Sequence, residues 1–244
     1  MKNLLILLLL TLCACENDDK ATKAVPQEQP EVTLPALKKV KVEPGKATII
    51  DGSDGTPVTT KVVKNDLNGD GEEDRLEVVI TKEENDGLGF KRQLVVYSGE
   101  GADLDAWYTA EEVILSTEHG GMMGDPLESV EIENGTIAIK HFGGSREKWD
   151  YVHRFRWQNG DFELIGTTTK SYDSCTEFAK FDYNLSTGQA EYSITPQDCS
   201  SGEIKEGVTV VLNFKKKMAP LTMNGFKTGE HELNAPEIKE TVYF

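Results

Sequence analysis

Hydrophobic and polar residues alternate over short stretches of this chain and predict a series of β-strands. Four such stretches pair around two Asn-Gly dipeptides: residues 130–133 and 136–139 around Asn134-Gly135, and residues 151–157 and 162–165 around Asn159-Gly160. Asn-Gly between alternating stretches is the strongest short signal of a β-hairpin, because both residues tolerate positive φ. The sequence therefore predicts two antiparallel hairpins.

Further strand-like stretches lie on both sides of these hairpins, at residues 75–81, 92–97, 208–214 and 241–244. Residues 109–115 have the pattern of a short helix. No repeat of fixed period is visible, which argues against a closed propeller of four or more blades. We expect an all-β, mainly antiparallel fold in which a β-meander forms a sandwich or open, propeller-like sheets.

One short loop combines acidic side chains with glycine in a spacing that suits a hard cation. Oxygen-bearing side chains stand at loop positions 1, 3, 5 and 9, which are Asp66, Asn68, Asp70 and Asp74. Ca²⁺ binds six to eight oxygens at about 2.3–2.6 Å, and Gly71 at position 6 permits the sharp turn that this needs. The Glu72 carbonyl is the natural backbone ligand. Without a cation the acidic side chains would repel one another.

The residues on either side of this loop distinguish two kinds of calcium site. The spacing continues to Glu77 at position 12 and fits the EF-hand pattern, but an EF-hand needs a helix on each side. Residues 59–63 and 76–80 are instead rich in β-branched residues and predict strands. The strand–loop–strand unit resembles the calcium loops of FG-GAP and VCBS repeats, found in β-propellers and singly in bacterial surface proteins. The resemblance implies a Ca²⁺ site within residues 66–77 whose ligands are Asp66, Asn68, Asp70, Glu72 (through its carbonyl) and Asp74.

The N-terminus predicts export and lipid attachment. Residues 4–12 are almost entirely aliphatic, a run too short to span a bilayer but suited to a secretory signal. The following Leu12-Cys13-Ala14-Cys15 resembles the lipobox of bacterial lipoproteins, which implies a signal peptide of residues 1–14 and acylation of Cys15. The lipid would anchor the protein to a membrane without spanning it. Glu16 after the cysteine favours the outer membrane over the inner. The alternative is an ordinary signal peptide that is cleaved without lipidation.

The cysteines agree with export. Cys13 leaves with the signal peptide and Cys15 is consumed by the lipid, so Cys175 and Cys199 remain. An even number of thiols in an oxidising compartment predicts a disulfide. Such a bridge closes a loop of about 25 residues and contributes about 3 kcal/mol by the chain-entropy estimate. The absence of a Cys-x-x-Cys spacing argues against a redox or zinc site.

The chain divides by composition into a tether and a domain. Residues 15–57 contain several prolines and many charges but no aromatic residue. Such a segment buries too little apolar surface to fold, so we expect a lipidated, disordered linker. Residues 58–244 have the length and the strand content of a single β-rich domain.

The net charge narrows the choice of partners. The chain carries 42 acidic and 26 basic side chains, for a net charge of −16. A protein this acidic is repelled by nucleic-acid phosphates, which excludes DNA and RNA as partners. Residues 215–217 are three consecutive lysines at the end of a strand-like run and indicate an exposed sheet edge.

Candidate catalytic groups are few. His119-Gly120-Gly121 and residues 141–145 resemble the glycine-rich oxyanion strips of esterases, but no Gly-x-Ser-x-Gly motif surrounds Ser145. His119 with Met122 and Met123 is a possible copper site by residue type alone. The histidines form no His-Glu-x-x-His motif. The simpler interpretation of both Gly-Gly pairs is a tight turn between strands, and the sequence favours a protein without catalytic activity.

Aromatic residues favour a binding role. Alternation places four side chains on one face of a single strand, which are Tyr151, His153, Phe155 and Trp157. This face is either part of the core or an exposed platform for stacking sugars. Three side chains beside the second Gly-Gly pair suit an anion or glycan pocket, namely Arg146, Lys148 and Trp149.

Taken together, these features predict a non-catalytic, calcium-stabilised lipoprotein of the cell envelope. It would sit on the periplasmic face or the surface of the outer membrane and bind an envelope protein or a glycan. Two alternatives stay open. One is an envelope hydrolase, acting on a glycan or an ester, whose site the sequence does not reveal. The other is a periplasmic enzyme inhibitor or accessory subunit.

Overall fold

A computed structural model of the chain describes residues 63–98, 105–238 and 241–244. All of these residues belong to the same compact unit. They form strands, turns and irregular segments, and they include no helix long and apolar enough to cross a membrane. The predicted signal peptide 1–14, the lipidated Cys15 and the linker 15–57 lie outside the described residues.

The strands are β1 (Val63–Asn65), β2 (Asp74–Glu84), β3 (Phe90–Ser98), β4 (Asp105–Ala110), β5 (Leu127–Glu133), β6 (Thr136–Gly144), β7 (Glu147–Gln158), β8 (Asp161–Asp173), β9 (Glu177–Asn184), β10 (Gln189–Asp198), β11 (Lys205–Glu206), β12 (Val210–Lys215), β13 (Glu232–Leu233) and β14 (Val242–Tyr243). They form three sheets, of eight, four and two strands. The predicted all-β fold is confirmed.

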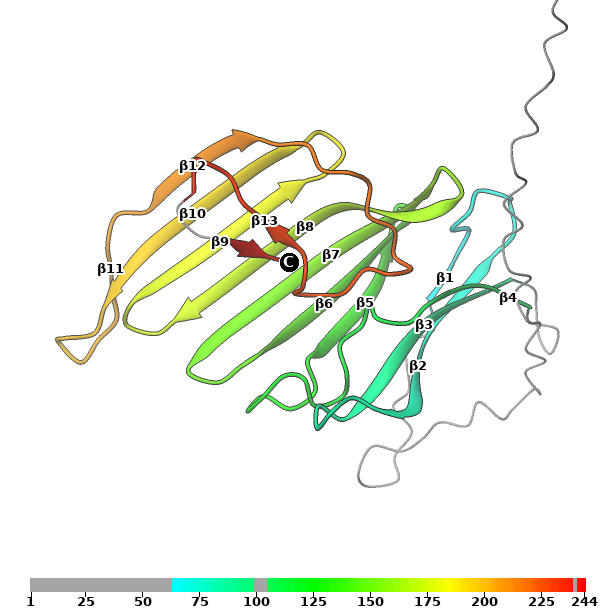
Figure 1. The fold of residues 1–244 in the computed structure, drawn as a ribbon, viewed down its shortest axis with the longest axis horizontal. Helices are drawn as coiled ribbons and strands as arrows, with labels where there is room; N and C mark the ends of the chain where they lie inside the picture. Colours follow the sequence, from blue (N-terminus) through cyan, green and yellow to red (C-terminus); the bar gives the residue numbers. More distant parts are fainter. Residues whose placement is uncertain (1–62, 99–104, 239–240) are drawn as a thin grey trace, which may run out of the picture. The chain divides into compact units, whose positions relative to one another are not determined.

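The eight-stranded sheet is an antiparallel meander. Strands β5 to β11 lie side by side in sequence order, and β12 turns back to pair with β10 on the side where β11 also pairs (Figure 1). Both predicted Asn-Gly hairpins are present, and the backbone shows why. Asn134 and Gly135 have φ of 50° and 70°, and Asn159 and Gly160 have φ of 55° and 84°. Two consecutive positive φ values define the turn that matches the twist of adjacent strands.

The predicted helix over residues 109–115 is wrong. The chain is extended through β4, and residues 111–116 are irregular. The side chains explain the difference. The rings of Trp107 and Tyr108 both pack against Phe162, with centroids 5.8 and 4.9 Å away. The free energy of burying these large rings outweighs a weak local preference for helix.

The large sheet has one buried face and one polar face. The residues of its buried face alternate along the strands and pair across them, and the largest are Ile137, Ile139, Phe155, Phe162, Phe181 and Tyr183. The opposite face carries ion pairs such as Lys140–Glu131 at 3.0 Å and Lys170–Asp150 at 2.9 Å. This alternation is typical of an antiparallel sheet that is covered on one side only.

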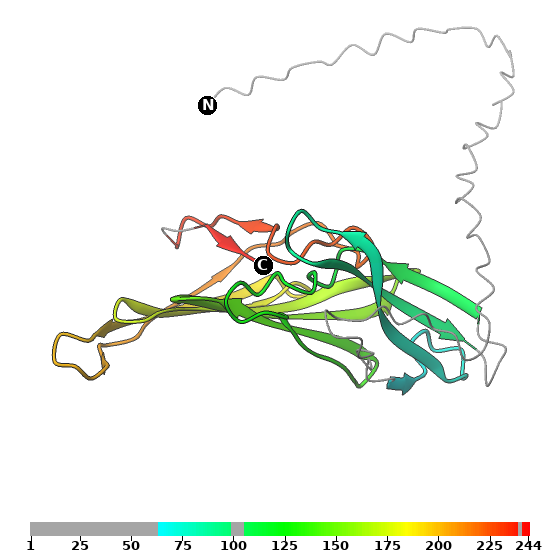
Figure 2. The same cartoon turned by 90° about the horizontal axis from the view of Figure 1, so that it is seen from below.

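Two parts of the chain cover the buried face. The four-stranded sheet β1–β4 contributes Trp107 and Tyr108, which pack on Trp157 and Phe162 near the β7–β8 turn. The C-terminal segment, residues 216–238 and 241–244, lies over another part of this face, and the β13–β14 pair is above the large sheet in Figure 2. The amide of Leu164 donates to the Leu221 carbonyl, and the amide of Met223 to the Phe162 carbonyl, both at 2.8 Å.

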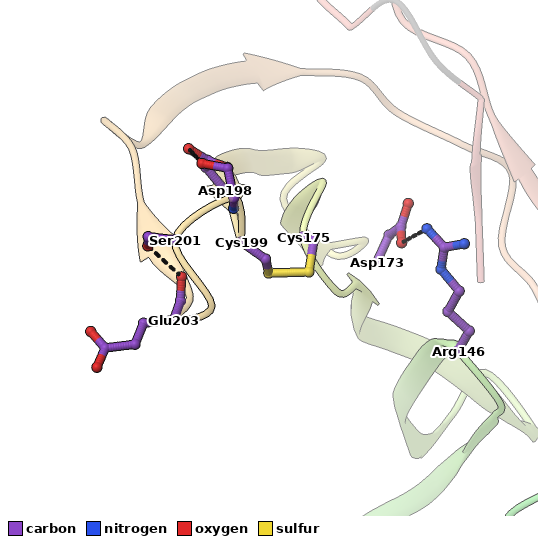
Figure 3. The surroundings of a disulfide bond; sticks show 8 residues. Arg146, Asp173, Cys175, Asp198, Cys199, Ser201 and Glu203 are labelled. Carbon is purple, nitrogen blue, oxygen red and sulfur yellow. Dashed lines mark hydrogen bonds and ion pairs between the residues drawn. A yellow bond between two sulfur atoms is a disulfide. The ribbon is translucent and has the colours of Figure 1, made fainter.

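The predicted disulfide is confirmed. Cys175 and Cys199 are joined, with their Cα atoms 5.0 Å apart. The bond links the turn between β8 and β9 to the chain immediately after β10 (Figure 3). It therefore fixes one end of the large sheet, close to where Arg146 lies 3.8 Å from Asp173.

The two Gly-Gly pairs pack against each other. The amide of Gly144 donates to the carbonyl of Gly120 at 2.9 Å, and Gly121 and Gly144 form a parallel bridge. A Cβ on Gly143 would lie 2.3 Å from the Trp149 ring and 2.9 Å from the Cα of Gly120. Glycine at this position lets the Trp149 ring approach β6 closely. The prediction of tight turns holds for Gly120-Gly121, which lies in a turn between β4 and β5, but is wrong for Gly143-Gly144, which forms the end of strand β6.

We therefore expect Gly143→Ala to destabilise the fold by about 1–3 kcal/mol, the usual cost of overpacking a tight contact. Urea unfolding followed by tryptophan fluorescence measures this loss. Gly166→Ala is the matched control, because a Cβ there would meet nothing closer than 3.6 Å and Gly166 also lies within a strand of the large sheet. Equal stability losses in the two variants would contradict the packing argument.

Candidate functional site

A cleft opens on the buried side of the large sheet, between the two parts of the chain that cover it. Its volume is about 540 Å³. One wall comes from β3 and residues 111–119, the other from residues 227–230, and β7 supplies the floor. The side chains that carry chemistry there are Asn85, Lys91, Glu111, His119, Trp149, Tyr151 and Glu230.

The two walls are joined to each other. The Lys227 ammonium lies 3.0 Å from the Glu112 carboxylate. The hydroxyl of Thr228 donates to the carbonyl of Val113 at 2.9 Å and is buried, so this contact is shielded from water. Because both contacts cross from residues 112–113 to residues 227–228, they fix the width of the cleft at this point.

Two aromatic rings form the floor. The centroids of Trp149 and Tyr151 are 5.0 Å apart, and the rings are tilted by 32°. Both side chains are partly exposed. Burial raises the pKa of the Tyr151 hydroxyl, so it stays protonated and can donate a hydrogen bond. Gly229, with φ of 80°, passes over this ring without a side chain, and a Cβ there would approach the Tyr151 hydroxyl to 3.5 Å.

A buried arginine holds the wall formed by residues 111–119. Arg92 is 1% exposed and donates to the Leu115 carbonyl at 3.0 Å and to the Asp125 carboxylate at 2.8 Å. The second guanidinium nitrogen also contacts the Asp125 carboxylate. Removing either partner would leave the other charge without its compensating group, so this pair fixes the path of the chain between β4 and β5.

All four histidines lie on this side of the sheet. The ring of His141 accepts a hydrogen bond from the Leu115 amide at 3.2 Å, and burial lowers its pKa to about 3. His153 is fully buried, and burial, with smaller effects of His141 and His231, holds its pKa well below the usual range. His119 lines the cleft, and burial lowers its pKa while Glu230 opposes the shift. The histidines are therefore neutral near pH 7.

The histidines make the stability of the fold dependent on pH. An unfolded histidine binds a proton below about pH 6.5, whereas buried His141 and His153 do not, so stability falls as the pH drops below that value. Each of the two should contribute a slope of about 1.4 kcal/mol per pH unit between pH 6 and pH 5. Urea unfolding at several pH values between 7.5 and 5 measures the slope.

His153→Leu is the informative variant, because His153 has neither ring nitrogen hydrogen-bonded within the described structure. We expect it to lower the slope by the contribution of one histidine. A slope that stays unchanged in this variant would show that the buried imidazoles are not the source of the acid sensitivity.

The structure places the predicted pocket residues in different surroundings. Trp149 lies in the cleft, but Arg146 faces Asp173 at 3.8 Å, and Lys148 is not among the residues that line it. Ser145 lies in the β6–β7 turn, where its amide donates to the Glu147 carbonyl. No hydrogen bond between the Ser145 hydroxyl and a histidine is found in the part of the chain that the structure describes.

The possible copper site is not supported by burial. Met122 is 84% exposed and Met123 is 44% exposed, whereas the Nδ1 atom of His119 is buried. The methionine side chains thus point to solvent while the imidazole faces the protein. Sequence reasoning missed Lys91, Glu111 and Glu230, which reach the cleft from distant segments.

The predicted calcium loop connects β1 to β2 and is flanked by strands on both sides. These flanks exclude an EF-hand, which needs helices. Asp66 accepts hydrogen bonds from the amides of Gly69 and Gly71 at 2.7 and 3.0 Å. Its side chain therefore points across the loop, and Gly69 and Gly71 supply the turn with φ of 81° and 90°.

The side chains of Asn68 and Asp70 also point across the loop. Asn68 accepts from the Asp70 amide at 2.9 Å, and Asp70 accepts from the Glu72 amide at 2.8 Å. The Asn68 amide also lies 2.8 Å from the second Asp70 oxygen. The Glu72 amide first, and then Asn68, hold the pKa of the Asp70 carboxyl below its usual value. The Asp70 carboxylate and the Asn68 carbonyl oxygen thus keep further lone pairs for a ligand, which fits a hard cation.

Asp74 differs from the other predicted ligands because it is fully buried. Its two oxygens accept from the Leu67 amide at 2.8 Å and from the Trp107 indole at 3.0 Å. In the described structure no three His, Cys, Asp or Glu side chains are arranged as a metal-binding group. The residues that fit a cation best are Asp66, Asn68 and Asp70, and Ca²⁺ binding stays a prediction.

Comparison of the chain with protein-family models, with curated proteins and with solved structures gave no match. The resemblance of the loop to FG-GAP and VCBS repeats therefore depends on residues 66–74 and on the strands that flank them.

Proposed function

We propose that the folded domain is a non-catalytic binding module that takes a glycan in the cleft. The observation that carries this proposal is the Trp149–Tyr151 pair on the cleft floor, which is partly exposed and held at 5.0 Å by the glycines around it. The face of a sugar ring presents C–H groups that pack on aromatic rings, and its edge presents hydroxyls.

The walls supply the polar partners that sugar hydroxyls need. Glu111 and Glu230 offer acceptor oxygens. Asn85 already donates to the Ser116 hydroxyl at 2.8 Å and the Lys91 ammonium pairs with Glu83, so these two side chains offer only their remaining N–H groups as donors. Aromatic rings on the floor and polar groups on the walls are the combination that orients a ligand with one apolar face and a polar edge. An apolar ligand would displace water from the Glu111 and Glu230 carboxylates without replacing its hydrogen bonds, at a cost in binding free energy.

The proposal includes the cell envelope as the place of action. The lipobox-like sequence supports attachment through Cys15 to the outer membrane, on its periplasmic face or its surface. The Cys175–Cys199 disulfide is consistent with an oxidising compartment outside the cytoplasm. A domain tethered there would meet envelope glycans. An envelope protein is the alternative partner for the same cleft.

We expect Trp149→Ala to weaken glycan binding at least tenfold, about 1.4 kcal/mol, because the stacking surface is lost. The measurement is a screen of soluble envelope oligosaccharides, including peptidoglycan fragments, followed by titration calorimetry of the strongest binder. Tyr172→Ala is the matched control, since Tyr172 also pairs with an aromatic ring, that of Phe178 at 5.0 Å, but does not line the cleft.

Two outcomes would contradict the proposal. One is that no oligosaccharide in the screen binds the protein. The other is binding that survives Trp149→Ala but is lost in Tyr172→Ala, which would place the ligand away from the cleft.

We propose in addition that Ca²⁺ stabilises the β1–β2 connection through Asp66, Asn68, Asp70 and the Glu72 carbonyl. Three of these side chains already point across the loop, as their hydrogen bonds to loop amides show. Asp74 would support the site indirectly. Its buried carboxylate fixes the end of the loop to Trp107 by accepting a hydrogen bond from the indole. The role is structural, because two strands joined by a short loop have no hinge to open.

We expect about 1 mM Ca²⁺, acting on a site with a dissociation constant of about 10 μM, to stabilise the fold by about 2.7 kcal/mol. A thermal melt, with and without a chelator, should show a shift of several degrees. Asp70→Ala should abolish the shift, whereas Glu84→Ala, an exposed carboxylate at the end of β2, should leave it intact. A melt that does not respond to Ca²⁺, or responds equally in Asp70→Ala, contradicts the site.

A further inference from the structure

The charges that line the cleft restrict the ligand it can take. Three acidic and three basic side chains belong to the lining, namely Glu111, Glu112, Glu230, Lys91, Arg92 and Lys227. His119 adds no charge near pH 7, because burial lowers its pKa. A count of the lining alone gives no net charge, so the partners of the basic side chains decide the balance.

Each basic side chain of the cleft already forms an ion pair. The three pairs are Lys91–Glu83, Arg92–Asp125 and Lys227–Glu112. Glu83 and Asp125 lie outside the lining, so each adds a negative charge that a count of the lining omits. The described residues include no ion pair of Glu111 or Glu230. Glu111 lies 3.5 Å from the Gln93 amide, a neutral group that leaves the charge of the carboxylate in place.

The surroundings of Glu230 show the same imbalance. Glu112 first, and then Glu230, raise the pKa of Lys227, so two carboxylates share one ammonium. Glu230 also opposes the downward shift of the pKa of His119 and His231, but burial is the larger effect at both imidazoles. Both rings are therefore neutral near pH 7, and neither compensates the Glu230 carboxylate. The cleft as a whole keeps an excess of negative charge.

The two unpaired carboxylates and the aromatic floor favour the same kind of ligand. Glu111 and Glu230 belong to opposite walls, which the contacts described above join at neighbouring residues. The rings of Trp149 and Tyr151 form the floor, with centroids 5.0 Å apart. The face of an aromatic ring carries partial negative charge and attracts a cation. Walls and floor together therefore favour a ligand that combines a positive charge with a flat apolar face.

We propose that the glycan bound in the cleft carries a protonated primary amine, as a hexosamine without its acetyl group does. This inference rests on the proposed glycan site and names the chemistry of its ligand. The ammonium binds between Glu111 and Glu230, whose oxygens accept its N–H groups, and the C–H face of the sugar packs on the floor rings. An acetylated amine has no charge and would leave both carboxylates without a counter-ion.

A lysine side chain of a protein partner would supply the same ammonium group. Its charge, however, stands at the end of a flexible four-carbon chain, which has no flat face to cover two adjacent rings. The aromatic floor therefore favours the amino sugar, and the lysine peptide becomes an outcome that the experiment must separate.

The test compares a glucosamine tetramer with its N-acetylated counterpart, since the two differ only in the acetyl groups. We expect the full chain in detergent, at about pH 6.5, to bind the amine form about tenfold more tightly in titration calorimetry. Glu230→Gln should remove most of this preference, because it deletes one charge and keeps the shape of the side chain. Glu237→Gln is the matched control, as an exposed carboxylate of the C-terminal segment that does not line the cleft.

The net charge of −16 attracts any oligoamine, so the place of binding needs its own check. Trp149→Ala should weaken binding of the glucosamine tetramer at least tenfold. Binding that Trp149→Ala and Glu230→Gln both leave unchanged overturns the inference, because attraction to the whole surface then explains it. A thermal melt checks the fold of Glu230→Gln, and Glu111→Gln takes its place if that variant is unstable.

The remaining outcomes separate this inference from the glycan proposal. Equal affinity for the two tetramers overturns the inference and leaves the glycan proposal standing. Failure of both tetramers to bind also overturns it, while the wider oligosaccharide screen decides the glycan proposal. A trilysine peptide that binds more tightly than the glucosamine tetramer, and loses affinity in Trp149→Ala, overturns both, because the ligand of the cleft is then a protein.

Discussion

The structure depends on covering one face of the eight-stranded sheet. That face carries aromatic, aliphatic and imidazole side chains, and within the described residues no second sheet of equal size packs against it. The small sheet β1–β4 covers one part, and the C-terminal residues 216–238 and 241–244 cover another. The C-terminal segment is tied down by the hydrogen bonds of Leu221 and Met223 to β8 and by Phe226, whose ring packs on His153 at 4.8 Å. Without these covers, the buried face would be exposed to water at a cost of many kcal/mol.

The two candidate sites follow from this arrangement. The cleft lies between the two parts of the chain that cover the sheet. Because these parts leave a gap over β7, the floor residues Trp149 and Tyr151 stay accessible. The predicted calcium loop is connected to the same packing through Asp74, whose carboxylate accepts a hydrogen bond from the Trp107 indole. Trp107 in turn packs on Trp157 with centroids 5.1 Å apart. A cation that orders the loop would therefore stabilise the junction of the two larger sheets as well as the β1–β2 turn.

Local features of the fold could be predicted from the sequence, and features that depend on distant contacts could not. The Asn-Gly hairpins are encoded by two adjacent residues, and the disulfide followed from counting cysteines. The predicted helix at 109–115 was wrong because the rings of Trp107 and Tyr108 are buried against a hairpin about 50 residues later. Trp149 was predicted to line a pocket, and it does line the cleft, but Glu230 was not predicted there. It reaches the cleft only because the C-terminal segment folds back over the sheet, and no pattern near residue 230 indicates this.

Amide hydrogen exchange, followed by NMR, tests the central claim most directly. If the C-terminal segment is an integral cover of the large sheet, the amides of Met223 and Phe244, which donate to Phe162 and His231 at 2.8 and 3.0 Å, should be protected. Their opening free energies should approach those of the β7–β8 ladder, because sheet and cover then open as one unit. Rapid exchange of both amides, with the β7–β8 amides still protected, would contradict the account. The sheet would then be stable without its cover, and the cleft would lack a fixed second wall.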